Sequence, residues 1–241
     1  MSDIHANLVA LDAVLRALDA GEPVDEIWHL GDVVGYGPDP DGVAGRLASL
    51  GARGVRGNHD AAACGGPEID WFNPDARRAM EWTRRTISDT TRSWLAALPE
   101  QSTTGDFTLV HGSPLDPTWE YVTSGPVASA NLAALGAQGG RHGLHGHTHV
   151  PAAWRVKDGR VAFSSPVHHP VQALDDGPAL LNPGSVGQPR DGDPRAAFAI
   201  LDTGAATIEW RRAAYDIPAV QAAMTAAGLP RWLITRLAAG Q

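Results

Sequence analysis

The stretch ARGVRGNHD, residues 52–60, decides the fold class of this chain. Its first five residues are predicted to form a short strand, which stops at the glycine, and Asn58, His59 and Asp60 follow the stop. Residues 26–32 (EIWHLGD) repeat the pattern, with an aspartate after the strand. Apolar residues at helical spacing predict a helix before each strand, at 6–20 and 41–50. This alternation predicts a largely parallel α/β sheet whose ligands bind beyond the carboxyl ends of its strands.

The rest of the chain is expected to complete a single domain, residues 1–241, with a helical insertion at about 64–100. Asn73-Pro74 is a good helix start, and Ser88 can cap a second helix. We expect this insertion to cover the site. The further predicted strands are 107–111, 142–146, 152–156, 161–164, 179–182 and 197–201, and the predicted terminal helices are 217–227 and 230–239.

Composition limits the classes of function that suit the chain. A net charge of -8 with histidine neutral argues against stable binding to nucleic acid or to an anionic membrane. It would also repel a phosphorylated substrate unless bound cations reverse the local field. The single cysteine, Cys64, excludes an internal disulfide, and we find neither a signal peptide nor an apolar run of membrane-spanning length. We therefore expect a cytoplasmic protein and leave its oligomeric state open.

Five short segments place polar side chains beside glycine or another small residue, and four of them follow a predicted strand. Carboxylate and imidazole groups are donors that suit Mn, Fe, Zn or Ni. Side chains two positions apart on extended backbone face the same way, so two such pairs can converge on one cleft. One pair occurs often by chance, whereas five segments in order predict a metal site. The segments are Asp3-Ile4-His5, Gly31-Asp32, Gly57-Asn58-His59-Asp60, His111-Gly112 and Gly146-His147-Thr148-His149.

In this order the segments resemble the pattern of the calcineurin-like metallophosphoesterase family, D-x-H, GD, GNH with Asp or Glu, H, and GHxH. The match runs from Asp3 to His149, and residues 182–185 (NPGS) resemble a segment that often follows GHTH in small bacterial members. The resemblance implies a four-layer αββα sandwich, in which two packed mixed sheets are flanked by helices and the site lies at one edge.

The resemblance also implies two divalent metal ions, with Mn expected first and Fe, Zn or Ni as alternatives. A hydroxide bridging the two metals would attack the phosphorus of a small phosphorylated substrate, a phosphate mono- or diester. Asp32 would bridge the metals. The implied ligands are Asp3, His5, Asp32 and His149 for one ion and Asp32, Asn58, His111 and His147 for the other.

Catalytic and substrate-binding roles are carried over in the same way. His59 is expected to act as general acid or transition-state donor without binding metal, and Asp60 to orient His59 or a ligand. Substrate contacts are predicted at Asn7, Tyr36 and Arg190. For Tyr36 the alternative is packing, and for Arg190 it is a surface ion pair.

The sequence departs from the family pattern in two places. Gly35 stands where relatives carry an acidic residue that supports the catalytic histidine, and Tyr36 stands where they carry a phosphate-binding arginine, which argues against a phosphoprotein phosphatase. Family members also have an apolar strand before D-x-H, so we expect the true start to lie upstream of Met1. If the chain begins there, an inner strand is missing, and Asp3 and His5 lie near a fraying terminus.

Two alternatives to an enzyme stay open, a catalytically silent metal-binding scaffold of the same fold and a nucleotide-binding regulator. The first is disfavoured because His59 and Asp32 are both retained, and no base-binding pocket can be identified for the second. Core packing is predicted, rather than a base-stacking platform, for Trp71, Trp82, Trp94 and Trp119. His29 and His145 are predicted to be structural, and His142, His168 and His169 to be solvated.

Overall fold

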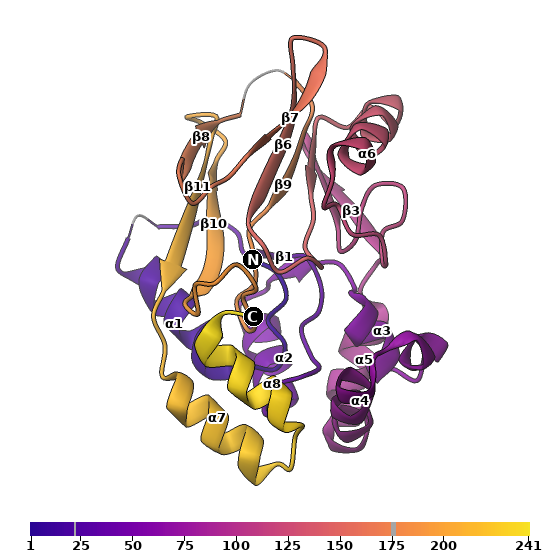
Figure 1. Ribbon diagram of the computed structural model, residues 1–241, viewed down its shortest axis with the longest axis vertical. Coiled ribbons are helices and arrows are strands. Elements are labelled where there is room, and N and C mark those ends of the chain that lie inside the picture. Colours follow the sequence, from indigo (N-terminus) through magenta and orange to yellow (C-terminus); the bar gives the residue numbers. More distant parts are fainter. Residues whose placement is uncertain (22, 175–176) are drawn as a thin grey trace.

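The computed structural model describes residues 1–21, 23–174 and 177–241, and it shows two β-sheets packed together between helices (Figure 1). The strands are β1 (Trp28–His29), β2 (Arg53–Gly54), β3 (Gln101–Thr104), β4 (Phe107–Val110), β5 (His142–Leu144), β6 (Ala152–Lys157), β7 (Arg160–Ser164), β8 (Val171–Ala173), β9 (Ala179–Asn182), β10 (Ala196–Asp202) and β11 (Thr207–Ala213). The helices are α1 (Leu8–Asp19), α2 (Pro40–Ser49), α3 (Asn58–Ala63), η1 (Pro67–Trp71), α4 (Pro74–Thr86), α5 (Asp89–Ala97), α6 (Gly125–Ala137), α7 (Ile217–Ala226), α8 (Arg231–Arg236) and η2 (Leu237–Ala239).

One sheet has six strands in the order β3-β4-β5-β9-β6-β7. Its central strands β4, β5 and β9 are parallel, while β3, β6 and β7 pair antiparallel with their neighbours. Helix α6 packs on the outer face through Leu132 and Leu135, which contact Trp154 and Leu180 of the sheet. The sheet is therefore mixed, as expected.

The other sheet is assembled from a parallel pair, β1 and β2, and an antiparallel group in the order β10-β11-β8. Residues 1–3 lie between these two parts, because they accept main-chain hydrogen bonds from Leu30 on one side and Val186 on the other, both at 3.0 Å. This segment occupies an inner position in the sheet, where a strand was expected to be missing if the chain begins at Met1. Asp3 and His5 are consequently buried rather than placed at a loose end.

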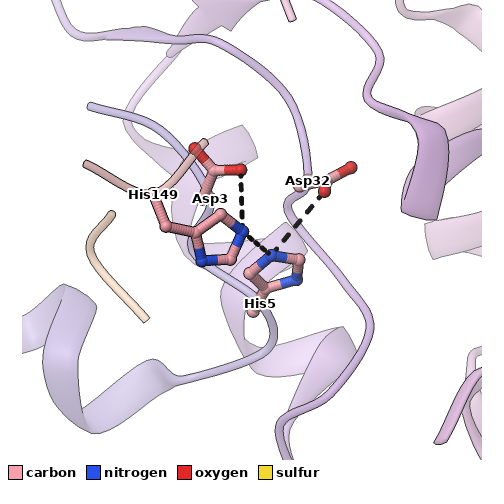
Figure 2. A group of neighbouring side chains, drawn as sticks. All are labelled: Asp3, His5, Asp32 and His149. Atoms are coloured by element: carbon pink, nitrogen blue, oxygen red, sulfur yellow. Dashed lines mark hydrogen bonds and ion pairs between the residues drawn. The ribbon is translucent and has the colours of Figure 1, made fainter. Parts of the chain in front are cut away.

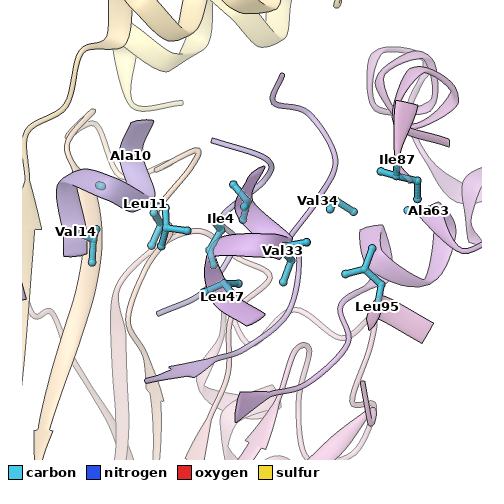
Figure 3. Packing of buried hydrophobic residues seen from close by; sticks show 14 of the residues in the cluster. Ile4, Ala10, Leu11, Val14, Val33, Val34, Leu47, Ala63, Ile87 and Leu95 are labelled. Atoms are coloured by element: carbon cyan, nitrogen blue, oxygen red, sulfur yellow. The ribbon is translucent and has the colours of Figure 1, made fainter. Parts of the chain in front are cut away.

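Two apolar cores hold the layers together. Between the sheets lie the buried side chains Leu30, Val55, Leu109, Leu144, Ile208 and Trp210. On the other face of the smaller sheet, α1 packs against β10 and β11, and Figure 3 shows Leu11, Val14, Leu47 and Ile4 in this second core. The resulting order, helix layer, sheet, sheet, helix layer, is the predicted four-layer sandwich.

A helical region follows β2 and confirms the helices predicted within residues 64–100. Asn73 caps α4 by accepting a hydrogen bond from Ala76 N at 3.0 Å, and Ser88 caps α5 through Thr91 N at 3.2 Å. Helices α7 and α8 share a buried cluster with α4 and Tyr36. Among the described residues, no helix is long and apolar enough to cross a membrane.

Several elements were absent from the sequence reading: α3, η1, α6, β3, β8 and β11. Helix α6 buries Ala128, Asn131, Leu132 and Leu135, a helical spacing that small and polar residues obscure. The two-residue strands β1 and β2 are shorter than predicted, because the chain leaves the sheet early to form the loops that carry the site.

Candidate metal centre

All seven predicted metal ligands converge at the edge of the sandwich where the parallel strands end. We call Asp3, His5, Asp32 and His149 the first ligand group (Figure 2), and Asp32, Asn58, His111 and His147 the second ligand group. The donor atoms of the first group lie within 4.8 Å of one another, and so do those of Asp32, His111 and His147. Each of the seven side chains is at most 3% exposed. The structure thus brings together residues that are up to 146 positions apart in the sequence.

The first ligand group forms a chain of close contacts around two imidazole rings. His149 Nε2 lies 3.3 Å from Asp3 Oδ1 and 3.1 Å from His5 Nε2, and His5 Nε2 lies 3.6 Å from Asp32 Oδ2 (Figure 2). The backbone amide of His147 also donates to both oxygens of Asp3, at 3.2 and 3.1 Å. These contacts fix the Asp3 carboxylate toward the site.

The tautomers of these two rings leave a place for a cation. The Nδ1 atom of His5 donates to the Val34 carbonyl at 3.1 Å, and that of His149 donates to the Gln188 carbonyl at 2.6 Å. A carbonyl can only accept, so both protons sit on Nδ1 and both Nε2 atoms present lone pairs to each other. Burial keeps the rings neutral by lowering the pKa of each well below its usual value. Two lone pairs at 3.1 Å are repulsive unless a cation lies beside them, so this donor set fits a metal ion.

The second ligand group is built around His111. Its Nδ1 donates to the Leu30 carbonyl at 2.7 Å, and its Nε2 lies 3.3 Å from Asp32 Oδ2, 3.0 Å from Asn58 Oδ1 and 3.1 Å from His147 Nδ1. Burial alone would lower the pKa of His111, but the charge of Asp32 and its hydrogen bond raise that pKa to about 9. A proton on His111 therefore supplies the positive charge that a metal ion would supply here.

Asp32 joins the two groups through a single oxygen. Its Oδ2 faces both His5 and His111, whereas its Oδ1 accepts a hydrogen bond from the His59 amide at 2.9 Å. Although burial opposes ionisation, the charge of His111 and its hydrogen bond hold the pKa of Asp32 well below its usual value. Burial raises the pKa of Asp3 to about 6. An ionised Asp32 is the geometric and electrostatic centre of the site.

Backbone strain marks the same residues. Positive φ angles, which are uncommon outside glycine, occur at five of the seven predicted ligands: Asp3 (52°), His5 (50°), Asp32 (52°), His147 (64°) and His149 (60°). Such conformations persist where the surroundings over-determine them, and they cluster at functional sites. Close packing adds a constraint at Gly146, where a side chain would collide with Ser2 and with the Asp3 carboxylate.

His59 lies beside the ligands, but no polar group supports its ring. Its Nδ1 atom is buried and has no hydrogen-bond partner among the described residues, and a side chain at Gly35 would occupy the space next to that atom. The ring is instead stacked on Phe72, with centroids 4.4 Å apart, and packed against Tyr36 at the same distance. Burial lowers the pKa of His59 to about 4, so the ring is neutral near pH 7.

Asp60 supports the loops around the site rather than the His59 ring. Its carboxylate accepts hydrogen bonds from the amides of Val34 at 3.1 Å and Gly57 at 3.0 Å. Burial and the charge of Asp32 raise the pKa of Asp60 to about 7. The side chain ties the loop after Asp32 to the start of α3, and it thereby positions Asn58.

The three predicted substrate contacts are placed differently. Asn7 is 2% exposed and caps α1, with its Oδ1 accepting from Ala10 N at 3.1 Å and its Nδ2 donating to the Gly187 carbonyl at 3.0 Å. A substrate contact would have to replace one of these bonds. Tyr36 packs against His5 with ring centroids 4.5 Å apart, so it borders the first ligand group.

Arg190 lies next to the site without an acidic partner. Its guanidinium sits 5.9 Å from the Tyr36 ring centre and donates to Gln188 Oε1 at 2.9 Å, and its buried Nε has no partner among the residues that the structure describes. No carboxylate within the described parts of the chain forms an ion pair with it, which is contrary to the alternative of a surface ion pair. The charge of the arginine is thus not neutralised by a carboxylate of the described residues, which suits an anion contact.

Sequence reasoning missed an aromatic surface beside the site and misplaced two side chains. Trp71 is 69% exposed, so core packing is wrong for this residue. His142 is 4% exposed, so the solvated position predicted for it is also wrong. Tyr121 stacks on His147 with centroids 3.9 Å apart. The concentration of Trp119 and Tyr121 in the proline-containing segment after His111 is the signal that could have pointed to this surface.

Comparisons with known proteins agree with this geometry. A family model described as the calcineurin-like phosphoesterase superfamily domain matches residues 1–206. The crystal structure of a metallophosphoesterase from Sphaerobacter thermophilus is similar, with a TM-score of 0.89, 44% sequence identity, and coverage of 100% of this chain and 98% of that one.

Two further relatives are similar in sequence. An uncharacterized protein of Methanocaldococcus jannaschii is 34% identical over 248 residues, which cover 100% of this chain and 97% of the relative. A symmetrical bis(5'-nucleosyl)-tetraphosphatase of Pectobacterium atrosepticum is 34% identical over 99 residues, covering 35% of each chain. With a family match over most of its length, the chain belongs to the calcineurin-like phosphoesterase superfamily and is a hydrolase that acts on phosphoester bonds.

Proposed function

We propose that the chain hydrolyses phosphate mono- or diesters with the help of two divalent cations, one in each ligand group. The observation that carries this proposal is the convergence of seven buried side chains at one place, where the single oxygen Oδ2 of Asp32 faces a histidine of each ligand group. Mixed imidazole and carboxylate donors suit manganese first, with iron, zinc and nickel as alternatives. Bound cations of this kind activate a water molecule for attack on phosphorus and neutralise charge on the phosphoryl oxygens.

The side chains of the site then have different proposed roles. Asp32 holds the two ligand groups together, and the carbonyls of Val34, Leu30 and Gln188 orient the imidazole rings by accepting their Nδ1 protons. Arg190, whose Nε has no partner, is the expected contact for a phosphoryl oxygen. Fixed charges and donors of this kind stabilise the transition state because they need no reorganisation.

His59 is the proposed proton donor to the leaving oxygen. Its neutral ring, with a pKa of about 4, must gain a proton when the substrate binds. The negative charge of a phosphate ester nearby raises the pKa of an imidazole, so substrate binding itself prepares the donor. Asp60 contributes indirectly, because it fixes the start of α3, the helix that carries His59.

A silent metal-binding scaffold is the second candidate, and one observation favours it. The ring of His59 lacks the acidic partner that the family pattern supplies, since Gly35 stands in its place. In that case the two ligand groups would bind metal, but no ester would be hydrolysed.

An assay with a matched pair of variants separates the two candidates. Purified wild type, Asp32→Asn and Asp25→Asn are given Mn²⁺, their metal content is measured, and each is tested on a panel of phosphate mono- and diesters. Asp25 is exposed and lies outside the site, so its variant should match wild type. We expect wild type to hydrolyse at least one class of ester and Asp32→Asn to lose on the order of 10³-fold in rate, because the shared ligand is weakened. Metal binding with equal background rates in all three proteins would favour the scaffold.

The expected partner is a small phosphorylated molecule. The name of the Pectobacterium atrosepticum relative, a bis(5'-nucleosyl)-tetraphosphatase, supports including nucleotides in the panel. A cytoplasmic location stays a prediction that rests on the single cysteine.

A further inference from the structure

Four aromatic side chains line the site from the ligand groups outward to solvent: three contact one another, and the fourth is joined to them through the ring of His147. We call Trp71, Phe72, Trp119 and Tyr121 the aromatic wall. Trp71 ends η1, Phe72 precedes the cap of α4, and the other two belong to the loop after β4. Two separate segments of the chain therefore contribute to one surface beside the site.

The rings follow one another at contact distance. Phe72 is stacked on His59 with centroids 4.4 Å apart, Trp119 lies 6.0 Å from Phe72, and Trp71 lies 5.0 Å from Trp119 in an edge-on arrangement. At the other end of the wall, Tyr121 is stacked on His147 at 3.9 Å. The wall thus touches both the proposed proton donor and a ligand of the second group.

The outer end of the wall is open. Trp71 is 69% exposed and Tyr121 is 48% exposed, while Phe72 and Trp119 are partly buried. Exposed tryptophan faces are unusual on a surface that only packs against the protein itself, because burial of such rings is strongly favourable. A row of partly exposed aromatic rings that leads into the proposed catalytic site is suited to bind a planar group by stacking.

Hydrogen bonds hold the loop in place without using the ring faces. Asp116 Oδ1 accepts from the amides of Thr118 and Trp119 at 3.1 and 3.0 Å. The carboxylate of Glu120 is turned to Ser113 Oγ and Asn131 Nδ2, at 2.6 Å each. The wall is therefore preorganised and carries no side-chain charge of its own, as a stacking surface requires.

We infer that the aromatic wall binds a planar heteroaromatic group on the leaving part of the substrate, so that the substrate class is a nucleobase-bearing phosphate ester. This inference rests on the proposed function. The leaving oxygen must lie next to His59, and the wall begins at that ring, so the group attached to this oxygen extends along the wall. Stacking of a base on an aromatic side chain tolerates every base, so no single base is singled out.

A matched pair of ligands tests the inference. Adenosine 5'-monophosphate and ribose 5-phosphate are both cleaved between phosphorus and the ribose 5'-oxygen, and their leaving alcohols differ in the base that replaces the anomeric hydroxyl. Their methyl diesters replace them if the enzyme accepts only diesters. For wild type with Mn²⁺ we expect kcat/KM to favour the base-bearing ester by on the order of ten-fold, mostly through KM. Trp71→Ala should bring this ratio of kcat/KM values close to one, whereas Trp71→Phe should retain most of the preference. Trp232 is another exposed tryptophan, and Trp232→Ala should leave the ratio unchanged.

Binding without turnover keeps the inference separate from the proposed function. In EDTA, adenosine 5'-monophosphate should quench tryptophan fluorescence of wild type and of Trp232→Ala more than ribose 5-phosphate does, and Trp71→Ala should lose this difference. If quenching depends on the base but no ester is hydrolysed, the proposed function is contradicted, while the role of the aromatic wall in binding a base is still supported. An equal kcat/KM ratio and equal quenching in wild type and Trp71→Ala would overturn the inference. Trp71 is largely exposed, so its replacement should not unfold the protein.

Discussion

The two ligand groups share Asp32 but differ in the backbone that presents them. In the first group every residue, Asp3, His5, Asp32 and His149, has a positive φ angle. In the second group, Asn58 is the first residue of α3 and His111 follows β4, and neither has a positive φ angle. The first ligand group is therefore made entirely of strained loop residues, whereas the second combines two such residues, Asp32 and His147, with two residues at the ends of regular elements.

This difference indicates where the cations contribute most to stability. A non-glycine residue in the left-handed region costs roughly 1–2 kcal/mol, so the first group holds several kcal/mol of strain. The second group carries its own positive charge, because the pKa of His111 is raised to about 9 by Asp32. The first group has no such proton between its two facing imidazoles. We conclude that it depends on a bound cation more than the second group does.

Removing the metals should have the largest effect. If each cation is present at about 100 times its dissociation constant, its binding adds about 2.7 kcal/mol to the free energy of unfolding. Two cations then add roughly 5 kcal/mol. EDTA should then lower the Tm by on the order of 10 °C, and Mn²⁺ should restore it. Thermal unfolding with and without chelator measures this shift.

Hydrogen exchange on the same samples sharpens the comparison. After chelation, the amides of residues 3–6, in and around the first group, should exchange faster, while those of Asn58 and His111, which belong to the second group alone, change little. Uniform acceleration over both ligand groups, or none, would contradict the assignment of greater metal dependence to the first group.

Replacing one histidine in each group should have an intermediate effect. In EDTA at pH 7, His111→Asn should lower the free energy of unfolding by about 3 kcal/mol, since it leaves the buried charge of Asp32 unpaired. His149→Asn should cost less than about 1 kcal/mol, because asparagine tolerates a positive φ angle and the facing lone pairs are removed. Urea unfolding of the two variants gives the values. A larger loss for His149→Asn would reverse our ranking of the two groups.

A buried histidine outside both groups provides a reference for pH dependence, with a smaller expected effect than His111→Asn. Burial lowers the pKa of His29 to about 3, and neither of its ring nitrogens has a partner among the described residues. Between pH 6.5 and 3 the unfolded chain binds the proton more readily, so the stability contributed by neutral His29 is complete above pH 6.5 and is lost as pH falls toward 3. Metal-free protein should lose about 2 kcal/mol through this residue between pH 7 and 5.

The variant His29→Leu isolates that contribution. It keeps a similar volume next to Trp94 and cannot take up a proton. Urea unfolding at pH 5, 6 and 7 should show a shallower loss of stability for the variant than for wild type. Parallel curves would mean that acid sensitivity arises in the ligand groups instead.

The sequence was sufficient for the features that depend on order and spacing. The strand ends at Asp32 and Asn58, and the pairs at Asp3 and His149, predicted a shared site because the carboxyl ends of parallel strands meet at one edge. The capped helices in the insertion could be predicted for a similar reason, since Asn73 and Ser88 act within one helical turn.

Features that depend on distant contacts could not be predicted in this way. No local pattern shows that residues 1–3 lie between Leu30 and Val186, or that a single oxygen of Asp32 faces both groups. The aromatic wall is formed by segments about fifty positions apart, so the exposure of Trp71 follows only from the folded chain.

The contact between Gly35 and His59 limits how this chain can be redesigned or can diverge. An acidic residue at position 35 would restore the partner that the family pattern supplies, but even its first side-chain atom would overlap the imidazole, and the φ angle of 89° disfavours any side chain there. The ring would have to move first, which its stacking on Phe72 opposes. A single substitution at Gly35 should therefore impair the site. At least two coordinated substitutions would be needed to change from a His59 ring beside glycine to one that is supported by an acidic residue.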